Sequence, residues 1–161
     1  ATVPWLLLLA AGVLRLRGRL LRATAFTLLA VFSLLGLQNY FHHQPKEAWD
    51  RVAAHVGERA QPDDLVVFVA GYVEVPFDYY FRRQEIALDR HPMASGTVEP
   101  DNLRALERAV LGRDRIWLVR SHSDGVDPTD SVLATLRRSH VEDVRAVFTG
   151  VEVHLMRSAS R

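Results

Sequence analysis

The feature that most constrains this chain is an apolar stretch over residues 20–37, LLRATAFTLLAVFSLLGL, in which Arg22 is the only charged residue. A helix needs about 20 apolar residues to cross the hydrocarbon core of a bilayer. The stretch reaches that length if Tyr40 and Phe41 form its interfacial end, where aromatic residues are common. Sequence of ordinary soluble composition follows. We therefore expect a membrane span that leads directly into a soluble domain.

A second apolar run, residues 3–14, precedes this stretch, and the turn between the two runs carries four arginines in eight residues: Arg15, Arg17, Arg19 and Arg22. Two apolar runs around a short basic turn predict a transmembrane helical hairpin over residues 1–41, with its first helix truncated. Short arginine-rich loops stay in the cytoplasm. This rule predicts a multi-pass protein of the cell membrane whose C-terminal domain, residues 42–161, is extracytoplasmic.

Other interpretations of the apolar runs remain open. Both could be core helices of a soluble protein, for which the 12-residue length of the first run is typical. A cleaved signal peptide fits less well, because an apolar run here also precedes the basic segment. The first run is too short to span, and the chain begins with Ala1. We therefore expect a fragment cut inside a transmembrane helix of a longer membrane protein.

Composition narrows the classes of function. About 120 of the 161 residues belong to the soluble part, a usual size for one domain. The formal net charge of +1 gives no electrostatic reason to expect a nucleic-acid partner. The absence of cysteine excludes disulfides, thiolate zinc sites and cysteine nucleophiles. Lys46 is the one lysine among many arginines, which indicates a GC-rich bacterial genome.

The soluble part alternates between predicted helices and strands. A helix opening at Pro45 would bury Trp49, Val52, Ala53 and Val56, which recur at helical spacing. The predicted strands are 65–70, 84–88, 115–120, 144–148 and 151–156, with a loop at 89–96. Further helices are expected around Phe77, Tyr80 and Phe81, over 101–111, and after Asp127, where Pro128 would take the first helical position.

This alternation predicts the fold class. Apolar strands interleaved with helices are typical of a parallel sheet covered on both faces. The last two strands, separated by Thr149 and Gly150, suggest a closing β-hairpin. We expect an α/β protein in which the transmembrane hairpin precedes a Rossmann-like three-layer α/β/α domain with a mainly parallel sheet and a C-terminal β-hairpin.

Two loops that follow predicted strands are candidate sites, and both have a simpler explanation. Gly71 occupies the place of a phosphate loop, but no G-x-G-x-x-G is present, and this disfavours nucleotide binding. Ser121, His122 and Asp124 are residue types of a hydrolase triad. Sequence neighbours rarely form a triad, whose geometry is assembled in space, so a turn is the favoured interpretation.

Histidines and aromatic residues complete the list of candidates. The seven histidines, including the pair His42 and His43, lack the spacing of a zinc site, so no metal ligands are assigned, and the sequence leaves any cofactor unidentified. The densest aromatic cluster follows the first strand, at the edge where open α/β sheets bind ligands. Most of its members suit core packing at helical spacing. Tyr72 and Tyr79 are the freer residues, and we expect them to contact substrate or the membrane part.

The order of short motifs along the chain resembles the C-terminal end of bacterial GT-C membrane glycosyltransferases, the group that includes protein O-mannosyltransferase-like and aminoarabinose-transferase-like proteins. The resemblance covers nearly all of the chain, through short motifs. These are an aromatic exit (39–41), a helix opening with KEAWD (46–50), a QPDD turn (61–64) before the first strand, a later tyrosine pair (79–80), and closing strands RIWLV (115–119) and GVEVHL (150–155).

The resemblance implies a function for the complete protein. Members of this family transfer a sugar from a polyprenyl-phosphate donor to an acceptor at the outer face of the membrane. Their catalytic acidic residue lies in early extracytoplasmic loops, outside this sequence, so no catalytic residue is assigned here. We expect an accessory extracytoplasmic domain whose partners are membrane lipid, the lipid-linked sugar and its acceptor. The alternatives are a membrane-anchored binding or scaffolding domain without enzymatic activity, and a transporter or other polytopic protein with a soluble tail.

Overall fold

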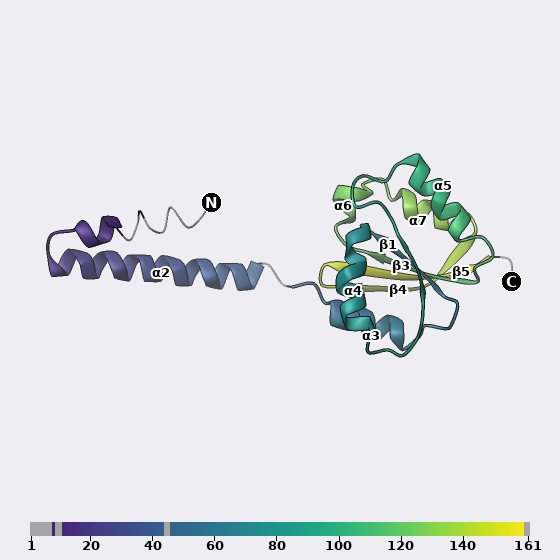
Figure 1. The fold of residues 1–161 in the computed structure, drawn as a ribbon, viewed down its shortest axis with the longest axis horizontal. Helices are drawn as coiled ribbons and strands as arrows, with labels where there is room; N and C mark the ends of the chain where they lie inside the picture. The colour runs from purple at the N-terminus through teal and green to yellow at the C-terminus, as the bar shows by residue number, and fades with distance from the viewer. Residues whose placement is uncertain (1–7, 9–10, 44–45, 160–161) are drawn as a thin grey trace. The chain divides into compact units, whose positions relative to one another are not determined.

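The computed structural model describes residues 8, 11–43 and 46–159 (Figure 1). The chain divides into two compact units, Ala1–Pro45 and Lys46–Arg161. Much of the first apolar run lies outside the described residues, as do the side chains of Phe41, His42 and His43. Each unit is described by itself.

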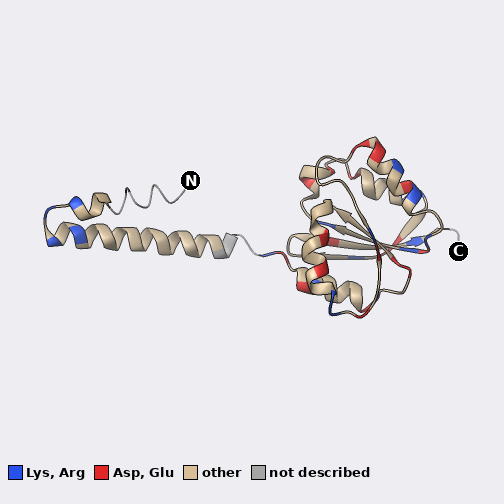
Figure 2. Cartoon of the chain, in the orientation of Figure 1, with Lys and Arg blue, Asp and Glu red and all other residues tan. Residues whose placement is uncertain are grey.

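In the first unit, residues 11–15 are helical, and a turn containing Gly18 leads into the long helix α2, Arg19–His43. The side chain of Arg22 donates a 2.9 Å hydrogen bond to the carbonyl of Leu16 and closes this turn. Basic side chains gather at the turn, while the body of α2 carries no charged side chain after Arg22 (Figure 2). Within the described residues, Arg19–Tyr40 is the one helix whose length and composition suit a membrane span or a signal sequence, and its most apolar window is wholly unburied.

The second unit is a mixed α/β domain around a five-stranded sheet. The strands are β1 (Leu65–Val69), β2 (Asp89–Pro92), β3 (Arg115–Arg120), β4 (His140–Phe148) and β5 (Val151–Ser158), in the spatial order β2-β1-β3-β5-β4. β1 is parallel to β2 and β3, whereas β5 is antiparallel to β3 and β4. The predicted mainly parallel sheet is therefore wrong, because the second strand of the hairpin pairs with β3 and makes half of the sheet antiparallel.

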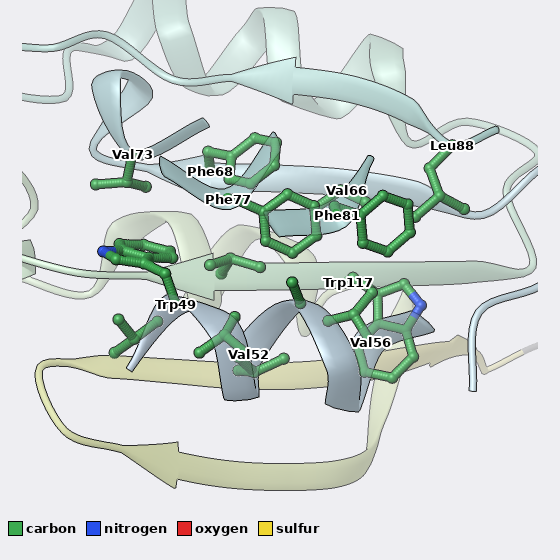
Figure 3. Packing of buried hydrophobic residues seen from close by; sticks show 14 of the residues in the cluster. Trp49, Val52, Val56, Val66, Phe68, Val73, Phe77, Phe81, Leu88 and Trp117 are labelled. Carbon is green, nitrogen blue, oxygen red and sulfur yellow. The ribbon is translucent and has the colours of Figure 1, made fainter. Parts of the chain in front are cut away.

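Two helices cover one face of the sheet, α3 (Trp49–Gly57) and α4 (Glu74–Phe81). Figure 3 shows their apolar side chains meeting those of β1 and β3. Phe77 lies 5.2 Å from Phe68 of β1 and stacks on Phe81 at 4.9 Å, measured between ring centroids. The predicted inward face of α3 is confirmed by the burial of Trp49, Val52, Ala53 and Val56. The helix begins at Trp49 rather than at Pro45, which lies outside the described residues.

The opposite face is covered by α5 (Pro100–Ala109) and α7 (Ser131–Leu136), which bury a second apolar cluster against β1 and β3. The predicted helix over 101–111 is confirmed within one to two residues. A reciprocal capping box between Glu99 and Asn102 fixes its start. The helix buries Leu106, which is completely shielded from solvent.

The shortest strand is where the sequence prediction fails. Residues 84–88 do not form a strand, and β2 lies at Asp89–Pro92, inside the stretch expected to be a loop. β2 is a polar, partly exposed edge strand that is held by parallel pairing with β1, in which Leu65 lies opposite Asp89. Such a strand carries no apolar pattern to reveal it. The closing hairpin is confirmed, with strands longer than expected.

The start of α7 also differs from the prediction. The helix begins at Ser131, and Pro128 is not part of it. The Asp127 carboxylate nevertheless stabilises this start, because it accepts hydrogen bonds of 2.8 and 2.9 Å from the backbone N–H groups of Ser131 and Val132. Asp127 thus satisfies the free N–H groups of the first turn from four residues upstream.

Candidate functional site at the carboxyl edge of the sheet

The path of the chain through the parallel strands singles out one position on the sheet. After β1 the chain passes through α4 on one face to reach β2, and it then passes through α5 on the other face to reach β3, on the far side of β1. The connection that leaves β1 and the connection that enters β3 therefore lie on opposite faces of the sheet. In open α/β sheets, ligands bind outside the carboxyl ends of the strands at such a reversal. The candidate site thus lies beyond β1 and β3.

Two segments that the sequence analysis treated separately meet at this point. The 3-10 turn η1 (Gly71–Val73) follows β1, and the short helix α6 (Ser123–Val126) follows β3. The backbone N–H of Ser121 donates a 2.7 Å hydrogen bond to the carbonyl of Val69. The rings of Tyr72 and His122 lie 6.2 Å apart between centroids. The glycine loop and the serine-histidine turn are therefore two halves of one site.

Glu47 joins these halves from the start of the domain. The hydroxyl of Ser121 donates a 2.6 Å hydrogen bond to Oε1 of Glu47, and Nε2 of His122 lies 3.0 Å from the same oxygen. The indole N–H of Trp49 donates to Oε2 at 2.7 Å. Sequence reasoning used Glu47 only as part of a family motif. Ser121 and His122 lie more than 70 positions away from it, and no local signal indicated that Glu47 joins them.

The arrangement of Ser121 and His122 does not form a hydrolase triad. In a triad the histidine accepts the proton of the serine hydroxyl, and the carboxylate orients the histidine. Here the hydroxyl and the imidazole both contact the same carboxylate oxygen. His122 has a left-handed backbone conformation, with φ of 53°, and its side chain is 60% exposed. The cluster offers hydrogen-bonding groups to a ligand but no activated nucleophile.

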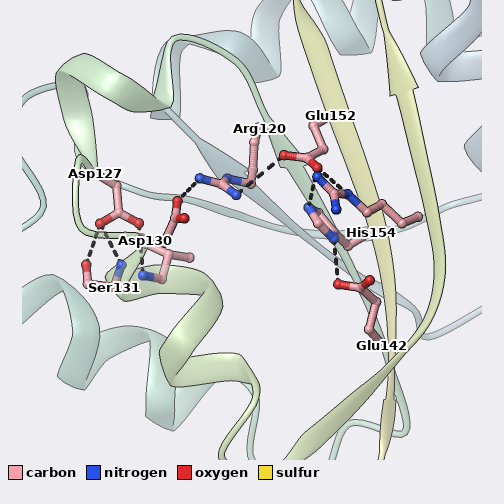
Figure 4. Close-up of polar contacts among 9 residues, drawn as sticks. Arg120, Asp127, Asp130, Ser131, Glu142, Glu152 and His154 are labelled. Atoms are coloured by element: carbon pink, nitrogen blue, oxygen red, sulfur yellow. Dashed lines mark hydrogen bonds and ion pairs between the residues drawn. The ribbon is translucent and has the colours of Figure 1, made fainter.

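A chain of ionic contacts continues from the same edge across the sheet (Figure 4). Arg120, the last residue of β3, pairs with Asp130 and lies 3.5 Å from Glu152 on the neighbouring strand. Nε of Arg145 donates a 2.6 Å hydrogen bond to the other carboxylate oxygen of Glu152. Arg120 is 8% exposed, and the carboxylates of Asp130 and Glu152 compensate its buried charge within the domain.

His154 extends this chain of contacts into the sheet. Its Nδ1 lies 3.0 Å from Glu142, and its Nε2 lies 3.5 Å from Glu152, although that second contact does not have hydrogen-bond geometry. The histidine is 1% exposed. Burial alone would raise the pKa of the Glu142 carboxyl group. Hydrogen bonds from His154 and Arg137 outweigh burial and lower this pKa below its ordinary value.

The strand register places these polar groups on one face. Arg120 lies directly opposite Glu152, and Glu152 lies opposite Val147 of β4. Two positions earlier on β3, the same face is apolar, because Leu118 belongs to the cluster beneath α5 and α7, whereas Leu118 lies opposite His154 on β5. This face of the sheet thus changes from apolar to polar near its carboxyl edge.

A cavity of about 330 Å³ opens at this polar end, between the loop after β3 and the turn of the β4–β5 hairpin. We call it the hairpin cavity. The residues that line it include Arg120, Ser121, His122, Arg145, Val147 and Glu152. A volume of this size suits one small ligand. The cavity adjoins the Glu47 cluster through Ser121 and His122.

A larger cavity, of about 650 Å³, lies at the opposite edge of the sheet, beside Gly112, His140 and Ala159. Its histidine is already partnered, because Nδ1 lies 2.8 Å from the Ser139 hydroxyl and Nε2 lies 2.9 Å from the Arg113 carbonyl. The chain continues from Ala159 into residues outside the described part. We place the candidate site at the hairpin cavity because the reversal of the strand order is at that edge.

The two tyrosines singled out from the sequence have different surroundings. Tyr72 is 47% exposed and takes part in the site through His122. Tyr79 is 64% exposed on α4, where its ring packs edge-on against Tyr80 at 5.0 Å. The structure thus joins Tyr72 to the carboxyl edge and leaves Tyr79 on the helix surface.

In the described part of the chain, no three His, Asp or Glu residues lie close enough together to hold a metal ion.

Two histidines outside the site have distinctive surroundings. Burial and the charge of Arg59 lower the pKa of His55, whose ring lies 5.5 Å from that of Phe148 and 6.2 Å from that of Trp117. Burial lowers the pKa of His91 on β2. Both imidazoles therefore favour the neutral form.

Comparisons of the chain with protein-family models, with curated proteins and with solved structures found no match.

Proposed function

We propose that this chain is the C-terminal part of an integral membrane glycosyltransferase that uses a polyprenyl-phosphate-linked sugar, and that residues 46–159 belong to its accessory extracytoplasmic domain. The observation that carries the proposal is the direct succession of an unburied apolar helix and an α/β domain with a polar, partly aromatic site at its carboxyl edge. The order of motifs described above adds the class of enzyme.

Glu47 ties the candidate site to the start of the domain. It accepts hydrogen bonds from the Ser121 hydroxyl and the Trp49 indole at the carboxyl edge. The hydrogen-bonding groups gathered there support the binding of a polar ligand, such as the sugar part of a lipid-linked donor.

The geometry supports binding rather than catalysis in this domain. Ser121 and His122 share one carboxylate oxygen, so neither acts as a base toward the other. We place the catalytic acidic residue elsewhere in the complete polypeptide. Tyr72 and Tyr79 are then proposed to shape the sugar site through their exposed rings, since aromatic faces suit both sugars and the interfacial zone.

The experiment uses the complete polypeptide encoded by the gene, in membranes supplied with radiolabelled polyprenyl-phosphate sugars. We expect label to leave the donor, and we expect Tyr72→Ala and Tyr79→Ala to raise KM several-fold with little change in kcat. Matched Tyr→Phe variants keep the aromatic face and should retain most of the affinity. Equal expression of all variants is verified by immunoblot.

Three results would contradict parts of the proposal. No donor consumption above that of membranes from cells carrying the empty vector would overturn the glycosyltransferase proposal and favour the membrane-anchored binding domain. Loss of kcat with KM unchanged would place catalysis in this domain. Unchanged kinetics in both alanine variants would remove the tyrosines from the site.

The Rossmann-like classification also remains a proposal. It is supported by the three parallel strands in the order β2-β1-β3 and by the two apolar clusters on opposite faces of the sheet.

A further inference from the structure

The hairpin cavity carries charges of both signs in nearly equal number. Among the lining residues, Arg120 and Arg145 are positive and Glu152 is negative. Two carboxylates outside the lining add negative charge through their contacts with lining residues, Asp130 with Arg120 and Glu47 with His122. Each arginine is already within 3.5 Å of a carboxylate oxygen. The cavity is therefore not an electropositive site.

This charge balance decides which class of ligand fits. A phosphate would compete with Glu152 for the guanidinium of Arg145, and a cation would compete with both arginines for the carboxylates. A neutral hydroxyl avoids both conflicts, because it donates one hydrogen bond and accepts others. It can donate to a carboxylate and accept from a guanidinium without displacing either. Several hydroxyls on one small ring could form hydrogen bonds with both the arginines and the carboxylates of the cavity.

The wall of the cavity supplies the other property that a sugar requires. Val147 lies opposite Glu152 and is 71% exposed, so an apolar surface stands beside the ion pair. The ring of Tyr72 lies outside the lining of the cavity, 6.2 Å from the ring of the lining residue His122. The C–H faces of a pyranose are apolar, whereas its hydroxyls are polar. Arg145 remains accessible to a ligand, since its side chain is 60% exposed.

We propose that the hairpin cavity binds the neutral sugar ring of the donor or acceptor, with Arg145 and Glu152 as its hydrogen-bonding pair and Val147 as its apolar wall. The choice of a sugar rests in part on the proposed function. The volume of about 330 Å³ suits one monosaccharide rather than a polyprenyl chain. The cavity lies at the carboxyl end of β3, next to the reversal of the strand order between β1 and β3.

The test measures binding without any transfer reaction. The full chain in nanodiscs is titrated with methyl glycopyranosides of hexoses and pentoses, and separately with inorganic phosphate, by saturation-transfer NMR. We expect millimolar binding of at least one glycoside and weaker binding of phosphate. Arg145→Ala and Val147→Trp should each reduce glycoside affinity at least tenfold, the first by removing a donor and the second by filling the cavity.

Arg157→Ala is the matched control. Arg157 is an arginine of the same hairpin, is 55% exposed, and donates to Asp143 at 2.6 Å, which closely matches the exposure and bond of Arg145. Its loss should leave glycoside binding unchanged. Because Val147 and Arg145 are both largely exposed, their variants are expected to melt within a few degrees of wild type, and melting curves verify this.

The outcomes separate this inference from the proposed function. No binding of any glycoside, tighter binding of phosphate, or equal affinity in the Arg145 and Val147 variants would overturn the sugar site even if the complete polypeptide transfers sugar. Glycoside binding that depends on Arg145 and Val147, together with no donor turnover, would keep the sugar site and overturn the glycosyltransferase proposal.

Discussion

Ser121 donates a 2.6 Å hydrogen bond to Glu47 across 74 positions of sequence. The serine is 3% exposed, so its hydroxyl has no water to replace this acceptor. The bond ties the segment that opens the domain to the carboxyl end of β3. It is the contact on which the arrangement of the candidate site most depends.

A double-mutant cycle measures this contact. Glu47→Ala should lower the free energy of unfolding by about 1–3 kcal/mol, because it leaves the shielded hydroxyl of Ser121 without its acceptor. Ser121→Ala should lower it by less, because Glu47 keeps its contacts with Trp49 and His122. The coupling between them should be on the order of 1 kcal/mol. Denaturant unfolding of the full chain in detergent gives these values. The exposed pair Glu58 and Arg59 serves as the control cycle, with coupling near zero. Equal coupling in the two cycles would show that the Glu47 contact does not stabilise the domain.

Gly150 offers a second test of the same edge. An added Cβ at Gly150 would lie 2.7 Å from Cγ of Glu47, whereas one at Gly112 would meet nothing within 4 Å. Both glycines have φ of 73° and therefore share the backbone strain of a left-handed conformation. We expect Gly150→Ala to be less stable than Gly112→Ala by about 1 kcal/mol or more. Adding Glu47→Ala should remove most of this difference, and an unchanged difference would place the clash elsewhere.

The sheet should not tolerate a charge at its centre. Val67 of β1 is completely buried, so Val67→Asp places an unpaired carboxylate in the apolar cluster beneath α5. We expect a loss of about 3–5 kcal/mol or more, which is comparable with the whole free energy of unfolding of a domain at the low end of the usual range. Val141→Asp is the control, because this strand valine is 60% exposed and lies opposite Arg157. A cooperatively melting Val67→Asp variant would show that β1 is not central to the core.

The domain should lose stability on mild acidification. The pKa of His55 in the folded state is below its ordinary value of 6.5, and the unfolded chain therefore binds more protons as the pH falls below 6.5. The melting temperature should decline from that pH downward, until the folded-state imidazole also titrates. His55→Phe should flatten the decline below pH 6.5, and His91→Phe should do the same, because the pKa of each histidine is lowered in the folded state. Superimposable pH profiles of wild type and both variants would contradict this assignment.

The pKa of Glu142 predicts a separate decline in more acidic solution. Its folded-state pKa is lowered below 4.5, so the stability it contributes is present above pH 4.5 and is lost as the pH falls through the folded-state value. Glu142→Gln should reduce this acid-dependent part of the stability while leaving the effect of His55 near pH 6 intact.

The orientation of the chain is tested with fused reporters. The arginines at positions 15, 17, 19 and 22 predict a cytoplasmic turn and an extracytoplasmic C-terminus. Alkaline phosphatase fused after Arg161 should be active, and a cytoplasm-only fluorescent reporter at the same place should not. Replacing the four arginines with glutamine provides the control, since it should weaken the bias. Fluorescence from the cytoplasmic reporter in the native sequence would reject both the orientation and the glycosyltransferase proposal.

The apolar pattern of the sequence was sufficient to predict those helices and strands whose periodicity is visible in neighbouring residues. Residues 65–69 and 115–120 are strands, within one residue of the predicted bounds. The periodic residues from Trp49 to Val56 are the buried face of a helix, and Thr149 and Gly150 divide a hairpin. Each of these depends on neighbours in the chain, because helix and strand periodicities are read over a few residues.

Only the tertiary structure decided what depends on distant pairing. The polar residues 89–92 are a strand because β1 pairs with them, and β5 runs antiparallel to β3 because the hairpin folds back onto the centre of the sheet. Glu47 belongs to the candidate site because Ser121 and His122 reach it from the end of β3. Such contacts lower the free energy only after the chain has closed loops of many residues, and no short stretch of sequence encodes them.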